Sequence, residues 1–569
     1  MRALPPHADL ALTLAQIEAS PLIERVRSCS HSFAAASPDT IAQIVEAAEG
    51  FAATILAPLN VAMDETGCVL EDGRVRTAPG HRDAWTAFID AGWPSLDAMP
   101  DAGGQGLPSI AALAVQALFD RACPAFGMQP VPQRSAARLI AAHGSAEQKA
   151  IWLPRLASGD LGATICISEA EAGSDVARVR TLASPDTGGG WSLTGEKCWI
   201  SFGDHDLTRE ILHCVLASTP GAAPGTAGLS LFLVPDQIDG RRNGVAVRRI
   251  EEKLGLHGSP TCALGFEAAK GEMIGAEGRG LAQMFAMIAN MRLSVGSMGL
   301  GIASAACDTA WAYARERRQG GRGPIAVPII DHADVQRQLL AMSARVELLR
   351  GLVFALANMV DLATHDSDPA ARAEMQALSG WLLPIVKTLG AETAFDVASD
   401  AIQVLGGAGY TREWPVEQGL RDARVLAVFE GTTGIQGLDL VHRRLIAEAR
   451  GFELFVAEAR GAAAGCDDAT AYALGHCLDT LEETAARLRA PGIARRDIDA
   501  GATAFLALAT LAATSWIAAR LSVIADDGPA GIQLRAVARF ALSTAPARAA
   551  WLGTEALAGA ARLEGFAQA

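Results

Sequence analysis

Glu430 has the sequence setting of a general base, a group that accepts a proton during catalysis. The apolar run Val425 to Phe429 leads into it, and Gly431 after it allows a sharp turn. Apolar surroundings penalise a charged carboxylate and raise its pKa toward the working range of a base. Thr433 is a candidate N-cap for a following helix, which the periodic apolar residues from Ile435 to Leu445 predict. A Glu beside Gly-Thr is by itself more often a solvated capping residue, so the rest of the chain must decide.

Length, charge and cysteine spacing restrict the class of protein that carries this segment. The chain has 569 residues, half of them apolar, which indicates a globular protein of three or four domains. Its formal net charge of -15 argues against a nucleic-acid or anionic-membrane partner, because phosphate binding needs a clustered positive field. The ten cysteines form no CxxC pair and no Cys/His cluster at zinc spacing, so we expect intracellular thiols and no metal site.

Two segments bear on localisation. Met1 to Leu14 lacks the charged-then-apolar order of a secretory signal. Phe505 to Ile524 is the best transmembrane candidate, but it contains Thr510, Thr514 and Arg520, which favours a buried helix. The sequence therefore predicts a cytoplasmic protein without an integral membrane span.

The hydrophobic period changes twice along the chain. Helical patterning dominates residues 42–156, and short β-type runs follow between Gly162 and Phe266, separated by Gly, Pro, Asp and Asn. The predicted strands are Thr164 to Ile167, Trp191 to Leu193, Lys197 to Ser201, Ile211 to Ala217, Leu229 to Val234, Val245 to Ile250 and Thr261 to Phe266. Helical patterning returns from Gly280 to Leu445 and again from Phe452. A mainly α protein with an antiparallel β-barrel or sandwich insert is expected.

Motifs at separated positions agree with this order. Cys166 to Asp175 is similar to C-[IV]-[ST]-E-P-x-A-G-S-D, Gly195 to Ser201 to G-x-K-x-[WF]-I-[ST], and Gln403 to Tyr410 to Q-x-x-G-G-x-G-[YF]. With the Glu-Gly-Thr at 430–432, the chain resembles the acyl-CoA dehydrogenase family over roughly residues 40 to 445. The resemblance implies a helical N-terminal domain (1–160), a middle antiparallel β domain (161–275), a C-terminal four-helix bundle with the catalytic Glu (276–448) and an additional helical extension (449–569).

The resemblance also implies site residues. Glu430 matches the catalytic base. FAD would be bound by Ile167, Ser168, Ser174, Trp199, Ser201, Arg317, Gln403, Gly407 and Thr432, and the acyl-CoA by Ser174, Arg292 and Phe429. A Trp199 indole beside the isoalloxazine would exclude water, and a guanidinium at Arg317 suits the flavin pyrophosphate of the neighbouring subunit. The family proline is Ala170 here, and the family glutamine four residues after the base is Gly434.

The implied reaction is FAD-dependent α,β-dehydrogenation of an acyl-CoA thioester to a trans-2-enoyl-CoA by a homodimer. Glu430 would remove the α proton, hydride would pass to flavin N5, and an electron-transfer flavoprotein would take the electrons. The extension and the spellings at Leu256 to Cys262 and Glu430 to Gln436 favour the large, 3-methylmercaptopropionyl-CoA-like branch. Two alternatives stay open, an acyl-CoA oxidase and an alkylation-response flavoprotein that binds DNA. The second needs a basic tail, and the residues from Phe452 have ten Arg against thirteen Asp and Glu.

Overall fold

The computed structural model describes residues 10–566, which form two compact units. The first, here the barrel unit, comprises residues 50–107 and 122–294. The second, here the helical unit, comprises the residues up to Glu49, 108–121 and those from 295 onward. The long helix α11 (Gly280–Glu316) contributes residues to both units. The residues before Leu10, on which the prediction of no secretory signal partly depends, lie outside the described part.

The β domain is a barrel, which is one of the two forms that the sequence predicted. Its strands are β3 (Leu161–Cys166), β4 (Leu182–Pro185), β5 (Trp191–Ser201), β6 (Glu210–Ser218), β7 (Leu229–Pro235), β10 (Val245–Ile250) and β11 (Thr261–Met273). Pairing runs β11-β5-β4-β6 and returns through β7 to β11, which closes a ring, with β10 and β3 at the two ends. Two short ribbons, β1-β2 (Val69–Glu71 and Arg74–Arg76) and β8-β9 (Gln237–Ile238 and Arg241–Arg242), accompany it.

Three details of the predicted β domain were wrong. The sheet is not purely antiparallel, because β3 and β4 both pair in parallel with β6. β4 was missed, since it is four residues long and buries a single side chain, Ala183, which leaves no clear alternation. β5 is one strand rather than two, because Gly195 and Glu196 continue the ladder opposite Phe266 and Gly265 of β11.

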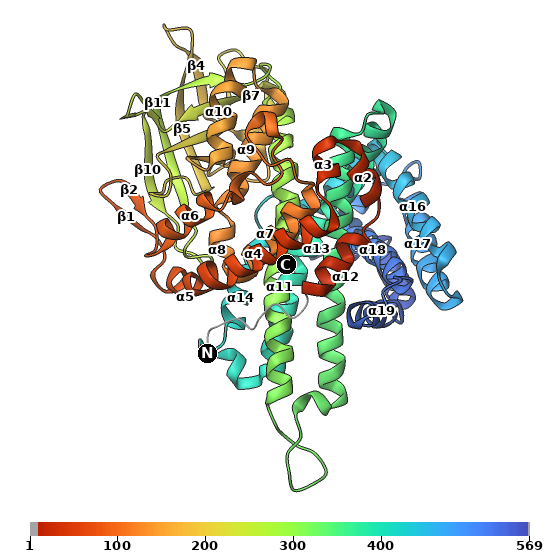
Figure 1. The fold of residues 1–569 in the computed structure, drawn as a ribbon. Coiled ribbons are helices and arrows are strands. Elements are labelled where there is room, and N and C mark those ends of the chain that lie inside the picture. Colours follow the sequence, from red (N-terminus) through yellow and green to blue (C-terminus); the bar gives the residue numbers. More distant parts are fainter. Residues whose placement is uncertain (1–9, 567–569) are drawn as a thin grey trace. The chain divides into compact units, whose positions relative to one another are not determined.

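Helices pack on the barrel against β6, a strand whose central residues are all buried. Leu212 and Cys214 of β6 join a core with Leu139 of α9 (Pro130–His143) and Trp152 of α10 (Ala146–Ser158), while Val215 faces a second core within the sheet. Figure 1 shows α9 and α10 beside the sheet. A strand buried on both faces has a continuous apolar run instead of alternation, which is the pattern that predicted it. The other helices of the unit are α5 (Ala57–Thr66), α6 (His81–Asp90) and α8 (Pro124–Gly127).

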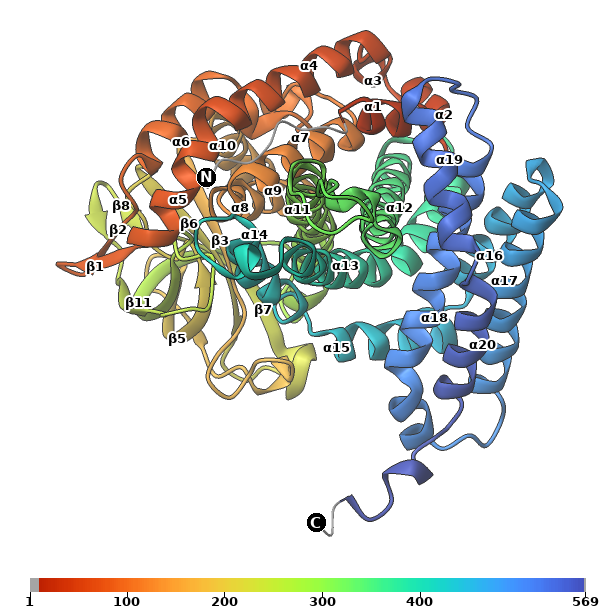
Figure 2. The same cartoon turned by 90° about the horizontal axis from the view of Figure 1, so that it is seen from below.

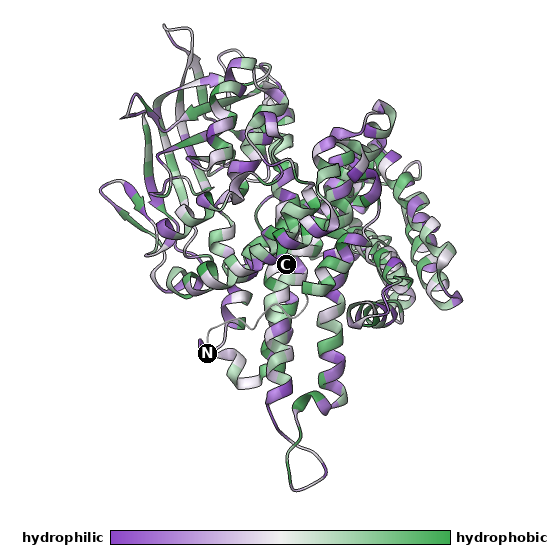
Figure 3. Ribbon diagram, in the orientation of Figure 1, coloured by the Kyte–Doolittle hydropathy of each residue, from purple (hydrophilic) through white to green (hydrophobic). Residues whose placement is uncertain are grey.

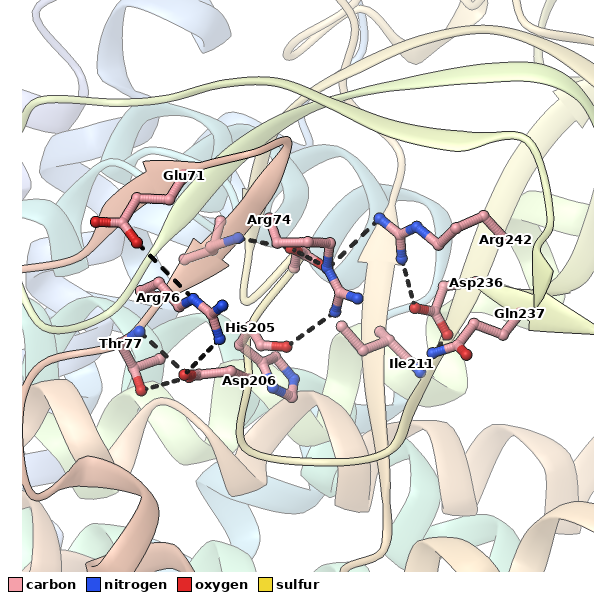
Figure 4. A network of polar contacts seen from close by, with 12 residues as sticks. Glu71, Arg74, Arg76, Thr77, His205, Asp206, Ile211, Asp236, Gln237 and Arg242 are labelled. Atoms are coloured by element: carbon pink, nitrogen blue, oxygen red, sulfur yellow. Dashed lines mark hydrogen bonds and ion pairs between the residues drawn. The ribbon is translucent and has the colours of Figure 1, made fainter. Parts of the chain in front are cut away.

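A polar network joins the β1-β2 ribbon to the barrel (Figure 4). Asp204 accepts from the Arg74 Nε at 2.9 Å and from the Val75 backbone N–H at 2.7 Å. Asp236 accepts from Arg242 at 2.9 Å and from the backbone N–H of Ile211 at 2.8 Å. Because Asp204 lies three residues beyond the end of β5, these contacts attach the segment after that strand to the β1-β2 ribbon.

The helical unit is built on two long neighbouring helices, α12 (Ala333–His365) and α13 (Pro369–Leu405). The extension adds α16 (Arg450–Ala462), α17 (Asp468–Leu488), α18 (Arg495–Ser522), α19 (Pro529–Leu542) and α20 (Ala545–Ala556), and Figure 2 shows α17, α18 and α20 side by side. Trp381 of α13 meets Phe452 of α16 and Phe505 of α18, with ring centroids 5.1 Å and 6.4 Å apart. These aromatic contacts attach the extension to the bundle.

The N-terminal segment also packs on α12. The segment comprises α1 (Leu10–Glu18), α2 (Ile23–Cys29), α3 (His31–Ala35) and α4 (Pro38–Phe51). A further helix, α7 (Ser109–Ala122), also belongs to the helical unit. Glu347 and Arg350 of α12 form an ion pair at 3.0 Å whose side chains are 3% exposed. Gln16 of α1 donates to Glu347 at 2.6 Å, and Arg350 donates to the Thr13 hydroxyl at 2.7 Å. α1 therefore contributes a hydrogen bond to each member of this buried ion pair.

Three helical stretches of the described chain have the length and apolar composition of a bilayer span: Pro38–Thr66, Gly280–Glu316 and Arg495–Ser522. In the second and third, 78% and 72% of the apolar window is buried within the protein, against 28% in the first. Figure 3 shows hydrophobic and hydrophilic residues mixed along α11. The expectation that Phe505 to Ile524 is a buried helix is confirmed for the part that α18 contains.

Candidate active site

The turn at Glu430 is strained and held from two sides. It lies between the 3-10 turn Arg424–Ala427 and α15 (Thr433–Leu438), and Glu430 has a φ of 55°, in the left-handed region that disfavours a residue with a side chain. The Gln436 amide donates to the Glu430 carbonyl at 2.9 Å and to the Gly431 carbonyl at 3.2 Å. From α13, the Lys387 ammonium donates to the Gly431 carbonyl at 2.7 Å. These contacts maintain a conformation that the backbone alone would not favour.

The predicted helix after the base is present, but its N-cap is Thr432 rather than Thr433. The Thr432 hydroxyl accepts from the Ile435 backbone N–H at 3.4 Å. Thr432 has the extended backbone that an N-cap requires, at φ -59° and ψ 162°, whereas Thr433 is already helical. The Thr433 hydroxyl is thereby released to donate to the Glu392 carboxylate of α13 at 3.3 Å.

A cavity of about 510 Å³ adjoins this turn. It is lined by Ala391, Glu392, Phe395, Asp396, Ala423, Arg424, Ala427, Val428, Thr432, Thr433 and Gly434. Burial raises the pKa of Glu392 and of Asp396 above the ordinary carboxyl range. The Arg424 guanidinium lies over the Phe395 ring at 5.8 Å, so the cavity offers charged, hydroxyl and aromatic contacts together. At Gly434, no described atom lies within 4 Å of where a Cβ would stand, so the missing glutamine leaves open space.

In the barrel unit, the structure brings the first two motifs together. The Cys198 backbone N–H of β5 donates to the Ser168 carbonyl at 3.0 Å, which joins the loop after β3 to the strand that carries Trp199. Trp199 is 62% exposed although Ile200 beside it is buried, and its φ of 63° is again left-handed. A strained, exposed indole at a strand end suits a flat ligand better than a core position. Ser201 follows, half-buried.

A buried ion pair supports this loop, and sequence reasoning assigned it no role. The Lys197 side chain is 0% exposed, and its ammonium donates to the Ile167 carbonyl at 2.9 Å and to Glu169 at 2.8 Å. Burial opposes the charge of Glu169, but Lys197 and the donors from Thr181 and Arg180 outweigh it and lower the pKa of Glu169. Both residues lie inside the quoted motifs, whose local spelling does not reveal that they pair.

Replacing Lys197 by methionine is expected to destabilise the barrel unit by about 3–5 kcal/mol, because a buried carboxylate would lose its partner. Chemical denaturation followed by tryptophan fluorescence measures this. Lys270→Met is the matched control, since its side chain is 67% exposed and reaches Asp186 only at 3.8 Å. The control should stay within about 0.5 kcal/mol of wild type. Equal unfolding midpoints for the two variants would contradict the role of Lys197.

The remaining predicted site residues divide between the units. Ile167, Ser174 and Arg292 lie in the barrel unit, where Ser174 is exposed on its loop and Arg292 is 8% exposed within α11. Arg317, Gln403, Gly407 and Phe429 lie in the helical unit with Glu430 and Thr432. The Arg317 side chain is exposed just after α11, and Gln403 and Gly407 stand at the C-terminal end of α13.

Each unit, taken by itself, leaves exposed groups whose chemistry suits part of a dinucleotide. Within the described chain, nothing lies within 4 Å of a Cβ placed on Gly406 or Gly407, so a phosphate could approach that backbone closely. The exposed Arg317 guanidinium can fork onto phosphate oxygens, and the exposed Trp199 indole offers a planar wall. By contrast, residues 10–566 contain no group of three or more His, Cys, Asp or Glu arranged to hold a metal ion.

Comparison with known proteins defines the class. Residues 38–160, 164–269 and 278–446 match the N-terminal, middle and C-terminal domains of acyl-CoA dehydrogenases. The fold is similar to that of an acyl-CoA dehydrogenase complexed with FAD from Bacillus anthracis, with a TM-score of 0.77, 20% identity, and coverage of 91% of this chain and 88% of that one. The chain therefore belongs to the acyl-CoA dehydrogenase family, and the resemblance of its motifs and the predicted fold class are confirmed.

Two members of the family are similar to this chain in sequence. The chain is 37% identical over 470 residues to the 3-methylmercaptopropionyl-CoA dehydrogenase of Ruegeria pomeroyi, which covers 80% of this chain and 79% of that protein. It is 35% identical over 380 residues to a broad-specificity linear acyl-CoA dehydrogenase of Mycobacterium tuberculosis, which covers 63% of this chain and 62% of that protein. As a member of the family, the protein is a FAD-dependent oxidoreductase of acyl-CoA thioesters, so the predicted cofactor and enzyme class are confirmed.

Proposed function

We propose that Glu430 is the base that removes the α proton of the acyl-CoA thioester. The observation that carries this is the left-handed Glu430 backbone, kept in place by Gln436 and Lys387. Strained residues are retained where the surrounding structure over-determines them, and they cluster at active sites. The apolar run that precedes Glu430 in the sequence, and a cavity lined by residues on either side of it, support the assignment.

The residues of the chain then divide the work of the reaction. The α C–H of a thioester is weakly acidic, and the Glu430 backbone N–H is the proposed donor to the thioester carbonyl, where negative charge develops. The Glu430 carboxylate takes the proton, and Phe429, Ser174 and Arg292 contact the acyl-CoA. Bound FAD supplies the hydride acceptor for the β carbon. The Trp199 indole would keep water out of that path.

FAD would be held by the residues that the family resemblance assigns to it, some of them supplied by a second copy of the chain. Ile167, Ser168, Ser174, Trp199, Ser201 and Thr432 would contact the flavin side, and Arg317, Gln403 and Gly407 the phosphates. Arg317 and the glycine turn are exposed in a single chain, which favours their use by a neighbouring copy. A homodimer is therefore part of the proposal, and sedimentation of the FAD-loaded protein tests it.

The substrate is proposed to be 3-methylmercaptopropionyl-CoA or a linear acyl-CoA, because the names of the two relatives above give such thioesters as their substrates. Anaerobic mixing of the FAD-loaded protein with a panel of acyl-CoAs is expected to bleach the flavin absorbance near 450 nm with at least one of them. The matching free acids serve as controls and should leave the flavin yellow. Absence of bleaching with every thioester would contradict the proposal.

An electron-transfer flavoprotein is the proposed acceptor, and the cytoplasm the proposed location. Oxygen is the alternative acceptor, which would make the protein an oxidase. Peroxide formed in proportion to the enoyl product would favour the oxidase, whereas reduction of an added electron-transfer flavoprotein without peroxide would favour the dehydrogenase. The near-neutral charge of the extension gives no support to the DNA-binding alternative.

A further inference from the structure

Lys387 is a cation in the interior of the helical unit. It lies on α13, its exposure is 0%, and its neighbours Ile385 and Val386 are equally buried. Long charged side chains are almost never fully buried without compensation, because removing an ammonium from water is costly. A cation kept at such a position needs a purpose beyond packing, which methionine would serve as well.

Lys387 contacts the turn that carries the base. Its ammonium donates to the Gly431 carbonyl at 2.7 Å, one residue after Glu430 and 44 residues away in sequence. A hydrogen bond from an ionised donor is shorter and stronger than a neutral one. Gln436 donates to the same carbonyl at 3.2 Å and to that of Glu430 at 2.9 Å. Two donors, one charged and one neutral, thus converge on the two carbonyls of a left-handed turn.

Other charged groups stand around this turn. Glu392 and Asp396 of α13 and Arg424 of the 3-10 turn before Glu430 line the cavity beside it. Thr433 donates to Glu392, and the Lys387 charge acts on the Glu392 carboxylate from within the same helix. Lys387 is therefore close enough to Glu392 for its charge to act there, and the carbonyl that it binds belongs to the residue next to Glu430.

We propose that Lys387 is a positioning residue for proton abstraction, which holds the Glu430–Gly431 turn in its left-handed conformation and favours the ionised form of the base by its charge. The inference rests on the proposed role of Glu430. Gln436 contributes the neutral part of the same restraint. Two consequences follow, one for the rate, through the geometry of the turn, and one for the pH profile, through the charge.

The test uses an acyl-CoA that reduces the flavin of the wild-type protein. The rate constant of flavin reduction is measured between pH 6 and 9 for Lys387→Met, Gln436→Met and Lys270→Met. Lys387→Met is expected to slow reduction about 100-fold, because a small misplacement of a reacting group costs that much. The acid limb, which is the low-pH side of the pH–rate profile where the base becomes protonated, should also move to higher pH by about one unit. The reason is that a nearby cation favours the ionised carboxylate, and the variant lacks it. Gln436→Met should slow reduction without moving the limb, and Lys270→Met should resemble wild type.

The outcomes separate this inference from the assignment of the base. A Lys387→Met enzyme with an unchanged rate and an unchanged limb would overturn the inference, as would a limb that moves equally in Gln436→Met. Rapid bleaching by Glu430→Gln, measured in parallel, would overturn the base itself. If Lys387→Met does not retain FAD, Lys387→Gln carries the test, because it keeps a polar amide but removes the charge. The same limb shift is expected for it.

Discussion

Glu430→Gln is expected to slow the reduction of the flavin by an acyl-CoA about 10⁴-fold, which is the upper range for the loss of a general base. Glutamine has the shape of glutamate but cannot accept the proton at neutral pH. Glu430 is half-buried, and the restraints on its turn, from Gln436 to the Glu430 carbonyl and from Lys387 to the Gly431 carbonyl, do not involve the carboxylate, so the turn should survive the change. Stopped-flow absorbance under anaerobic conditions measures the loss, and a rate constant that falls at unchanged substrate affinity would place it on the transition state.

Glu453→Gln is the matched control for this experiment. Glu453 is exposed in the first turn of α16, in the same unit as Glu430 but in the extension. The control should bleach at the wild-type rate, and both variants should bind FAD and melt near the wild-type temperature. If Glu430→Gln bleached within tenfold of wild type, proton abstraction would have to be assigned to another group.

The second large effect concerns acid. Three histidines of the barrel unit, His81, His205 and His213, are buried, and burial lowers the pKa of each from 6.5 to about 3. Below pH 6.5 these histidines therefore become protonated in the unfolded chain, whereas in the folded chain they stay neutral down to about pH 3. The free energy of unfolding of the barrel unit is thus highest above pH 6.5 and decreases as the pH falls below it. Each histidine costs about 1.4 kcal/mol per pH unit in that window, so together they cost about 4 kcal/mol per unit.

Urea unfolding of the barrel unit at intervals from pH 7 to pH 4.5 measures this slope, in a window where most carboxylates stay ionised. His81→Phe should remove about a third of it, because His81 packs against the Phe126 and Phe202 rings, 5.5 Å and 6.1 Å away, and phenylalanine can fill that space. His31→Gln, at an exposed position of α3, is the control and should leave the slope unchanged. A slope that His81→Phe does not alter would contradict the assignment.

Much of the fold could be predicted because its signals are local. Helical spacing marked the residues of α12 and α18, and the apolar runs of β6 and β7 marked buried strands. β4 and the parallel pairs could not be predicted, because strand order depends on which segments meet in space. The predicted N-cap, Thr433, was one residue off, because either threonine of the pair could cap the helix. The observed N-cap is Thr432, whose backbone is extended.

For the candidate site, the family and its chemistry could be predicted before folding: the motifs around Ser168, Trp199 and Glu430 carry the resemblance, because short-range spacing and residue type are enough to define them. How the backbone of those residues is restrained could be seen only in the folded chain. Lys197 reaches Ile167 across 30 residues, and Lys387 reaches Gly431 across 44. Such contacts leave no local periodicity, since a buried lysine resembles a surface lysine until the chain has folded around it.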